Sequence, residues 1–171
     1  IGSLCHHCVI LKNGMIDYIG NTEQAIDLYR KSNQDIQIES IELNNSSRAQ
    51  KDLYISGFDT FAGVRKTSEF DYEDIIRFRF TVSSKIKTSF TLRVALFDID
   101  NVRVLAFDSE DIGQIFYLEK NEEKEIEVKS CESLNIKPGK YRVNISVRQG
   151  DIILDHIIGA RYIEVKESDF Y

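Results

Sequence analysis

Alternation of apolar and polar residues with a period of two is the feature that most limits how this chain can fold. Over residues 76–82, 92–97 and 141–148, and less regularly over 36–43, apolar side chains occupy every second position. Successive side chains of a strand point to opposite faces of a sheet, so each stretch predicts a strand with one face in a core.

Turn residues separate these stretches. Asp98 to Asn101, Pro138-Gly139 and Gln149-Gly150-Asp151 are typical of tight turns. Many short antiparallel strands without a long helical stretch between them predict a sandwich or a barrel. Residues 45–68 are polar and weakly patterned, so we expect a long surface loop there, with a short strand near 53–55.

The first residues follow a different pattern. An apolar run at 9–11, an Asn-Gly turn and a second run at 15–19 predict a hairpin. Asn21-Thr22 then predicts the capped start of an amphipathic helix that ends near residue 33. We therefore expect two segments, 1–33 and 34–171.

Composition excludes some classes of partner. Lys and Arg number 22 and Asp and Glu 28, which gives a net charge of −6. Such a charge argues against nucleic-acid binding and against direct docking on anionic lipid. No apolar run approaches the ~20 residues of a membrane span, so we expect no membrane insertion. Three cysteines without framework spacing fit a reducing compartment. The chain opens on Ile1 without a methionine, which favours a fragment of a longer polypeptide.

The sequence "LCHHC" at positions 4–8 concentrates two cysteines and two histidines. Zinc needs four ligands that converge, normally as two short pairs from separate turns. On a strand these contiguous side chains would diverge, and elsewhere only Cys131 and His156 remain, each alone. Cys-x-x-Cys redox motifs sit at a helix start, which this stretch does not resemble. We expect ordinary side chains here, and no metal or cofactor.

The first 32 residues, "IGSLCHHCVILKNGMIDYIGNTEQAIDLYRKS", resemble the end of an ABC-transporter ATPase domain. That family closes with Leu-Cys, an apolar strand, a Gly turn, a second strand, a Gly and a helix carrying Ile and Tyr. The matching residues here are Leu4-Cys5, Val9 to Leu11, Gly14, Gly20, and Ile26 with Tyr29. The resemblance implies that the full-length protein is such an ATPase. The chain itself lacks the G-x-x-x-x-G-K-[ST] phosphate loop, so we expect it to be no enzyme.

The remainder resembles the C-terminal domain of polysaccharide-export ATPase subunits of the O-antigen (Wzt) type. Three stretches carry this resemblance: "EFDYEDIIRFRFTV" at 69–82, "LRVALFDIDNVRV" at 92–104 and residues 136–171, where Ile136, Gly139 and Tyr141 hold a Leu-x-x-Gly-x-Tyr pattern. It implies a mainly β fold: an antiparallel, immunoglobulin-like or jelly-roll β-sandwich with a short N-terminal hairpin–helix appendage.

The resemblance also implies a function. Such domains are carbohydrate-binding modules that recognise a finished polysaccharide, here a lipid-linked O-antigen, before export. The proteins are cytoplasmic, peripheral at the inner membrane, homodimeric, and partnered with a transmembrane permease. Related teichoic-acid and capsule exporters leave an alternative open: a dimerisation or permease-docking domain that does not recognise a glycan.

Polar strand positions are where a glycan would bind. Sugars need hydrogen bonds to their hydroxyls and aromatic or apolar contact with the ring. Arginines recur at the outward phase of the alternating strands, and the fixed guanidinium fork suits vicinal hydroxyls and acids. The candidate carbohydrate-binding residues are therefore Arg77, Arg79, Arg93, Arg142, Asn144, Arg148 and, as an aromatic platform, Tyr72. The competing interpretation is a solvated face on which arginines pair with acids across strands.

A catalytic function finds no support in the residues. Glycoside hydrolysis needs two carboxylates at a defined separation, which a sequence does not reveal. His156 lies in "LDHIIG", where a half-buried strand histidine is the ordinary expectation, and no Ser-His-Asp set is evident.

Overall fold

The computed structural model describes residues 5–12, 14–34, 50–133 and 136–166. The chain divides into two compact units, Ile1–Ile38 and Glu39–Tyr171. The predicted segment boundary, between residues 33 and 34, falls inside the helix of the first unit. The strand predicted over 36–43 lies outside the described residues.

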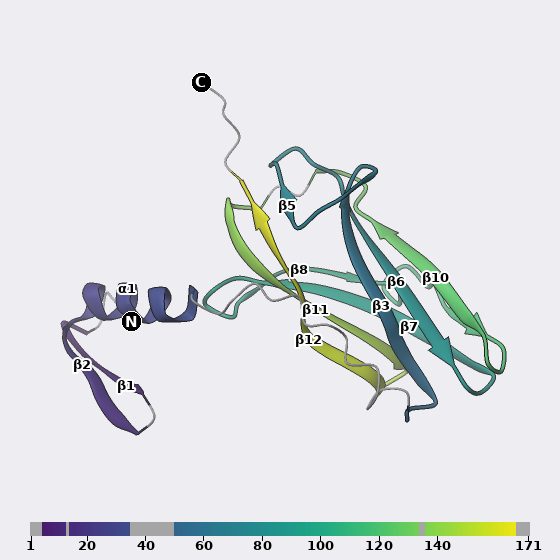
Figure 1. Ribbon diagram of the computed structural model, residues 1–171, viewed down its shortest axis with the longest axis horizontal. Helices are drawn as coiled ribbons and strands as arrows, with labels where there is room; N and C mark the ends of the chain where they lie inside the picture. The colour runs from purple at the N-terminus through teal and green to yellow at the C-terminus, as the bar shows by residue number, and fades with distance from the viewer. Residues whose placement is uncertain (1–4, 13, 35–49, 134–135, 167–171) are drawn as a thin grey trace. The chain divides into compact units, whose positions relative to one another are not determined.

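The first unit is a hairpin followed by a helix, as the sequence predicted. Strands β1 (His7–Lys12) and β2 (Met15–Asn21) pair antiparallel, and α1 spans Thr22–Gln34 (Figure 1). The Asn21 side chain accepts a hydrogen bond from the Glu23 N–H at 2.8 Å, which caps the helix. The Thr22 hydroxyl donates to the Cys5 carbonyl at 2.6 Å, so the start of the helix is tied to the strand entry.

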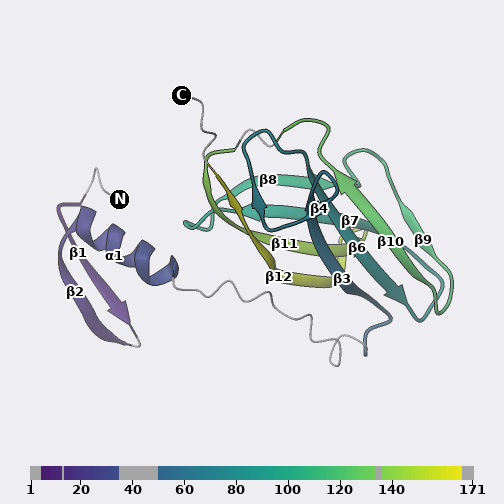
Figure 2. The same ribbon diagram turned by 45° about the horizontal axis from the view of Figure 1, so that its top comes forward.

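The second unit is a β-sandwich of two sheets, which confirms the predicted fold class (Figures 1 and 2). The four-stranded sheet has the order β10 (Glu123–Lys129), β6 (Ile76–Ser84), β3 (Leu53–Ala62) and β4 (Arg65–Lys66). The six-stranded sheet has the order β5 (Glu69–Phe70), β12 (Ile152–Val165), β11 (Gly139–Gln149), β7 (Thr88–Phe97) and β8 (Arg103–Asp108), with β9 (Phe116–Leu118) also on β7. Among the described residues of this unit, every strand pairing is antiparallel except that of β5 with β12.

One core joins the inner faces of both sheets. Strand β6 alternates strictly between buried and half-buried side chains, with Phe78 and Phe80 fully buried. They belong to the same apolar cluster as Val94 of β7 and Ile145 of β11. Burying each such side chain is worth about 1.5–3 kcal/mol, so the alternation that predicted the strands also supplies the cohesion between the sheets.

The long loop predicted over 45–68 is wrong where the structure describes it. Strand β3 runs for ten residues, Leu53–Ala62. A bulge between Ile55 and Gly57 shifts the inward positions from odd to even numbers. The extra residue of a bulge interrupts strict alternation, so a period of two could not reveal this strand.

The Pro-Gly-x-Tyr sequence before β11 has a structural explanation. The buried Tyr141 hydroxyl donates to the Lys137 carbonyl four residues upstream. Immunoglobulin-like sandwiches use a tyrosine in the same way to fix a strand entry. Burial raises the pKa of Tyr141, and the negative charge of Asp98 adds to the effect.

Candidate functional site

The structure distributes the predicted carbohydrate-binding residues over both sheets. Arg77 and Arg79 lie on β6, in the four-stranded sheet. Arg93 lies on β7, and Arg142, Asn144 and Arg148 lie on β11, in the six-stranded sheet.

All of these side chains point outward, as the alternation predicted. The inner faces of the two sheets share one core, so the two outer faces point away from each other. The sequence suggested one face that carries all of these arginines, whereas the structure divides them between two opposite faces. The reason is that the chain passes from one sheet to the other between β6 and β7, where no strong turn signal marks the change.

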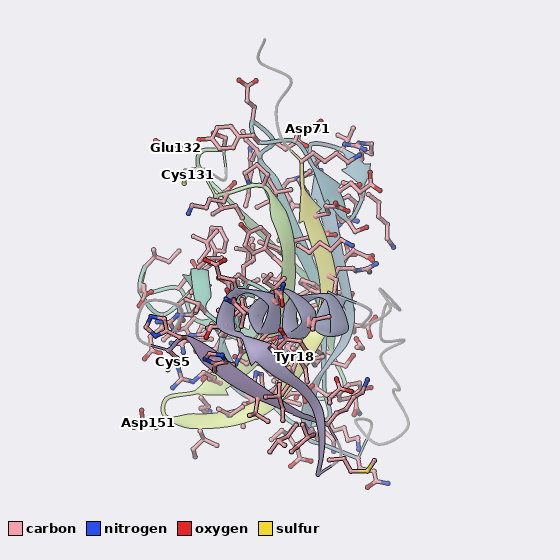
Figure 3. All side chains as sticks on the ribbon, turned by 90° about the vertical axis from the view of Figure 1, so that its left-hand side faces the viewer. Cys5, Tyr18, Asp71, Cys131, Glu132 and Asp151 are labelled. Atoms are coloured by element: carbon pink, nitrogen blue, oxygen red, sulfur yellow. The ribbon has the colours of Figure 1, made fainter. Side chains whose placement is uncertain are left out.

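Tyr72 lies on neither outer face. It is half-buried in the turn between β5 and β6, where the Asp74 carboxylate accepts a hydrogen bond from the Asp71 N–H. Figure 3 shows Asp71 at one end of the sandwich, near Cys131 and Glu132, with Asp151 at the other end. Tyr72, which the sequence suggested as an aromatic platform, thus lies at the end of the sandwich that carries Asp71 and is separate from the arginines on the two outer faces.

The outer face of the six-stranded sheet, which we call the six-strand face, is organised in rows that cross the strands. Residues directly opposite on neighbouring strands have their Cβ atoms about 4.5–5.5 Å apart. In the first row, the polar row, His156 of β12 lies opposite Ser146, and Ser146 lies opposite Arg93. Arg93 is held at the far end of the row, because its Nε and Nη2 both contact Oδ2 of Asp108 at 2.5 Å.

The second row consists of short side chains. Asn144 lies opposite Ala95, and Ala95 lies opposite Ala106 of β8. Ala95 and Asn144 are 6% and 8% exposed although they are on the outer face. Neighbouring side chains therefore cover most of the surface of this short-side-chain row.

The third row, the aromatic row, places an arginine between two aromatic rings. Tyr162 of β12 lies opposite Arg142, and Arg142 lies opposite Phe97 of β7. The Arg142 guanidinium carbon is 5.4 Å from the centroid of the Phe97 ring, and Nη2 donates to Oδ1 of Asn101. These two contacts fix the guanidinium group before any ligand arrives.

Asn144 has a structural task that the sequence did not reveal. Strand β12 bulges opposite it, and its Oδ1 accepts a hydrogen bond from the Gly159 N–H at 2.9 Å. Gly159 has φ = +69°, which a residue with a side chain rarely adopts. A Cβ at Gly159 would also lie 3.3 Å from the Tyr162 hydroxyl and 3.7 Å from Cδ of Arg142, so this glycine lets both side chains lie over the bulge.

Arg148 lies one row beyond the polar row, opposite Thr91. Among the described residues it forms no ion pair, and its buried Nε has no hydrogen-bond partner. On the same strand face, Arg142 and Arg148 are six residues apart, about 20 Å. The six-strand face therefore presents arginines at both ends of an extended surface.

Sequence reasoning missed the two rings of the aromatic row. Phe97 occupies an outward position, like Arg93 and Ala95. An aromatic residue among the outward positions of this strand was the feature of the sequence that could have indicated its role. Tyr162 gave no such signal, because the bulge in β12 shifts the alternation before it.

The "LCHHC" stretch shows contacts within its own unit. Cys8 Sγ lies 3.4 Å from the Thr22 hydroxyl, and Cys5 is exposed. Within residues 5–12, 14–34, 50–133 and 136–166, no group of three or more His, Cys, Asp or Glu side chains is placed to hold a metal ion. No helix in those residues is long and apolar enough to cross a membrane.

Comparison with known proteins identifies the fold. No family model matches the chain, and no curated protein matches its sequence. The crystal structure of the C-terminal domain of Wzt is similar with a TM-score of 0.61 and 11% identity, covering 70% of this chain and 76% of that one. A glycosyl hydrolase family 2 member from Bacteroides cellulosilyticus DSM 14838 is similar with a TM-score of 0.50 and 18% identity, over 67% of this chain and 15% of that chain. At these identities the likeness is one of β-sandwich fold.

Proposed function

We propose that the sandwich is a non-catalytic binding module for a bacterial cell-surface polysaccharide, and that the glycan lies along the short-side-chain row of the six-strand face. The observation that carries this proposal is the arrangement of three rows: short side chains between a polar row and an aromatic row. Sugar rings are bound by hydrogen bonds to their hydroxyls together with aromatic contact on their C–H faces. The six-strand face offers polar groups on one side of the short-side-chain row and aromatic rings on the other.

The rows have complementary roles in this proposal. Phe97 and Tyr162 would contact the apolar faces of sugar rings, while Arg142 between them donates to hydroxyl or acidic groups. Ser146 and His156 would donate or accept hydrogen bonds from the other side. Side chains i and i+4 on one strand are about 13 Å apart, so the polar and aromatic rows leave room for an extended glycan between them.

Export also requires release, so we expect weak binding. A dissociation constant of roughly 10 μM to 1 mM corresponds to only about 4 to 7 kcal/mol. A few hydrogen bonds and one or two ring contacts are sufficient for such a free energy.

The wider role that we propose rests on the resemblance of the first 32 residues to the end of an ABC-transporter ATPase domain. The ligand would be a lipid-linked O-antigen, bound in the cytoplasm near its finished end. The protein would act as a homodimer at the inner membrane, where the ATPase couples it to a transmembrane permease. The fold likeness to the C-terminal domain of Wzt supports this role.

Two arginines provide a matched test of the site. Arg142 and Arg79 each lie over a phenylalanine ring, at 5.4 and 4.6 Å, but on opposite faces of the sandwich. Binding of the 171-residue chain to a panel of purified bacterial cell-surface polysaccharides is measured by calorimetry. We expect Arg142→Ala to weaken binding about tenfold or more, since a hydrogen bond to a charged group is worth about 1.5–3 kcal/mol. Arg79→Ala should bind like the parent.

Two results would contradict the proposal. An Arg142→Ala variant that binds the polysaccharide no more weakly than Arg79→Ala does would show that the six-strand face is not the binding surface. Failure of the parent chain to bind any polysaccharide in the panel would favour the alternative, a dimerisation or permease-docking domain.

A further inference from the structure

The opposite outer face, that of the four-stranded sheet, carries a second unusual row of side chains. Lys66 of β4 lies opposite Phe61 of β3, Phe61 lies opposite Arg77 of β6, and Arg77 lies opposite Lys129 of β10. Three cations and one aromatic ring thus form a single row across all four strands, which we call the basic row. The protein as a whole has a net charge of −6, so a row with three positive charges differs in sign from the overall charge.

The Arg77–Lys129 pair is unfavourable for the folded sheet by itself. Like charges directly opposite on neighbouring strands destabilise a sheet, and their Cβ atoms lie only about 5 Å apart. Within the described residues Lys129 has no ion pair, whereas Glu127, two residues earlier, is shared between Arg77 at 3.2 Å and Arg79 at 3.7 Å. One carboxylate for two arginines leaves the lysine charge uncompensated.

A second carboxylate near the basic row, that of Asp59, is also shared between two cations. Asp59 contacts Lys66 at 2.6 Å and Arg161 at 3.1 Å. In the part of the chain that the structure describes, the two carboxylates in ion pairs at this end of the face are each divided between two cations. An excess of positive charge remains around the basic row.

The arginine of the row is held in place. The Arg77 guanidinium lies over the Phe61 ring at 5.6 Å, Nη2 donates to the Gly63 carbonyl, and Nη1 contacts Glu127. Phe61 is only 8% exposed, because Arg79 covers the same ring at 4.6 Å. A fixed guanidinium group loses less conformational entropy when it binds an anion than a free arginine does.

From this geometry we infer that the basic row binds a phosphoryl group between Arg77 and Lys129. A phosphoryl dianion supplies the negative charge that Lys129 lacks and that Arg77 receives only from the shared Glu127 carboxylate. Its oxygens accept hydrogen bonds from both an ammonium and a guanidinium group. Lys66 contributes positive potential from the far side of Phe61. This site lies on the face opposite the proposed polysaccharide site, so it goes beyond the proposed function and stands independently of it.

Titration with inorganic phosphate tests the inference. Binding to the 171-residue chain is followed by NMR chemical shifts at constant ionic strength, with sodium chloride as the reference salt. Lys129→Gln removes the uncompensated cation without touching the Arg77–Phe61 contact. Lys85→Gln makes the same charge change at another exposed lysine, outside this row.

We expect the parent and Lys85→Gln to bind phosphate alike, and Lys129→Gln to bind about fivefold to tenfold more weakly. Shift changes in the parent should centre on β6 and β10. Equal affinities for the two variants, or a parent that responds to phosphate no more than to chloride, would overturn the inference.

Vesicles distinguish the source of the phosphoryl group. Co-sedimentation with phosphatidylcholine vesicles containing phosphatidic acid, lost in Lys129→Gln, would assign the group to a lipid headgroup. Phosphate binding in solution without co-sedimentation would assign it to a soluble ligand. Co-sedimentation that Lys129→Gln leaves unchanged would overturn a lipid headgroup as the ligand of this row.

Discussion

The Asp155 carboxylate of β12 accepts a hydrogen bond from the backbone N–H of Ile55 in β3 at 3.0 Å, across 100 residues of sequence. These two strands belong to different sheets, so the contact joins the sheets along one edge of the sandwich. Lys51 also contacts this carboxylate, which is only 1% exposed. Further along the same strand, Arg161 donates to the Phe58 carbonyl and contacts Asp59.

Asp155→Ala tests how much this contact stabilises the sandwich. The substitution leaves the buried Ile55 N–H without its acceptor, so we expect unfolding to become easier by about 1–3 kcal/mol. Urea denaturation should show a lower midpoint with an unchanged slope. Asp155→Asn keeps an acceptor for the amide and should lose less. The exposed turn residue Asp151 provides the control, and a loss in Asp151→Ala equal to that in Asp155→Ala would contradict the assignment.

Asn144 was predicted as a ligand residue, and its contact with Gly159 leads to a different expectation. Asn144→Ala removes the acceptor of the Gly159 N–H, so we expect a loss of stability of about 1–3 kcal/mol even without glycan. Asn144→Asp keeps an oxygen at the same place and should stay near the parent in thermal denaturation. An Asn144→Ala variant as stable as the parent would show that the bulge does not depend on this hydrogen bond.

Tyr162 tests the aromatic row. If sugar rings stack there, Tyr162→Ala should weaken polysaccharide binding about fivefold to tenfold, since a ring contact is worth on the order of 1 kcal/mol. Tyr117 of β9 is 65% exposed and serves as a matched control, because Tyr117→Ala removes a ring that lies outside the rows. Calorimetry with the same polysaccharide measures both. Unchanged affinity in Tyr162→Ala would remove this ring from the site.

The Glu69–Lys166 pair predicts a pH dependence. Lys166 Nζ lies 2.5 Å from Glu69 Oε2, and this hydrogen bond, with the positive charge of Lys166, lowers the pKa of Glu69 below its ordinary 4.5. A lowered carboxyl pKa contributes stability that is fully present above 4.5 and is lost as the pH falls through the folded-state pKa.

Carbon-detected NMR of the Glu69 carboxyl should therefore give a pKa below 4.5, and Lys166→Gln should raise it toward that value. The same substitution should remove the corresponding part of the acid sensitivity of β5–β12 pairing. An unchanged Glu69 pKa in Lys166→Gln would show that the pair does not persist in solution.

The sequence by itself determined the local features of this protein. Alternation of side chains within one strand is a local property, so it correctly placed Phe78 and Phe80 inward and Arg77 and Arg79 outward. The Asn21 cap is equally local, because the side chain bonds an amide two residues away. These features follow from backbone geometry alone and need no knowledge of the neighbouring strands.

Only the tertiary structure decided which outward residues meet. Strand pairing is a choice among distant segments, and alternation carries no information about it: β6 and β7 look alike in sequence but belong to different sheets. Bulges in β3 and β12 shift which positions face the core, and a bulge forms only where a strand pairs with its partner. For this reason the alternation revealed neither the full length of β3 nor the outward position of Tyr162. The residue types of a binding face were therefore readable from the sequence, whereas their assembly into rows depended on long-range pairing.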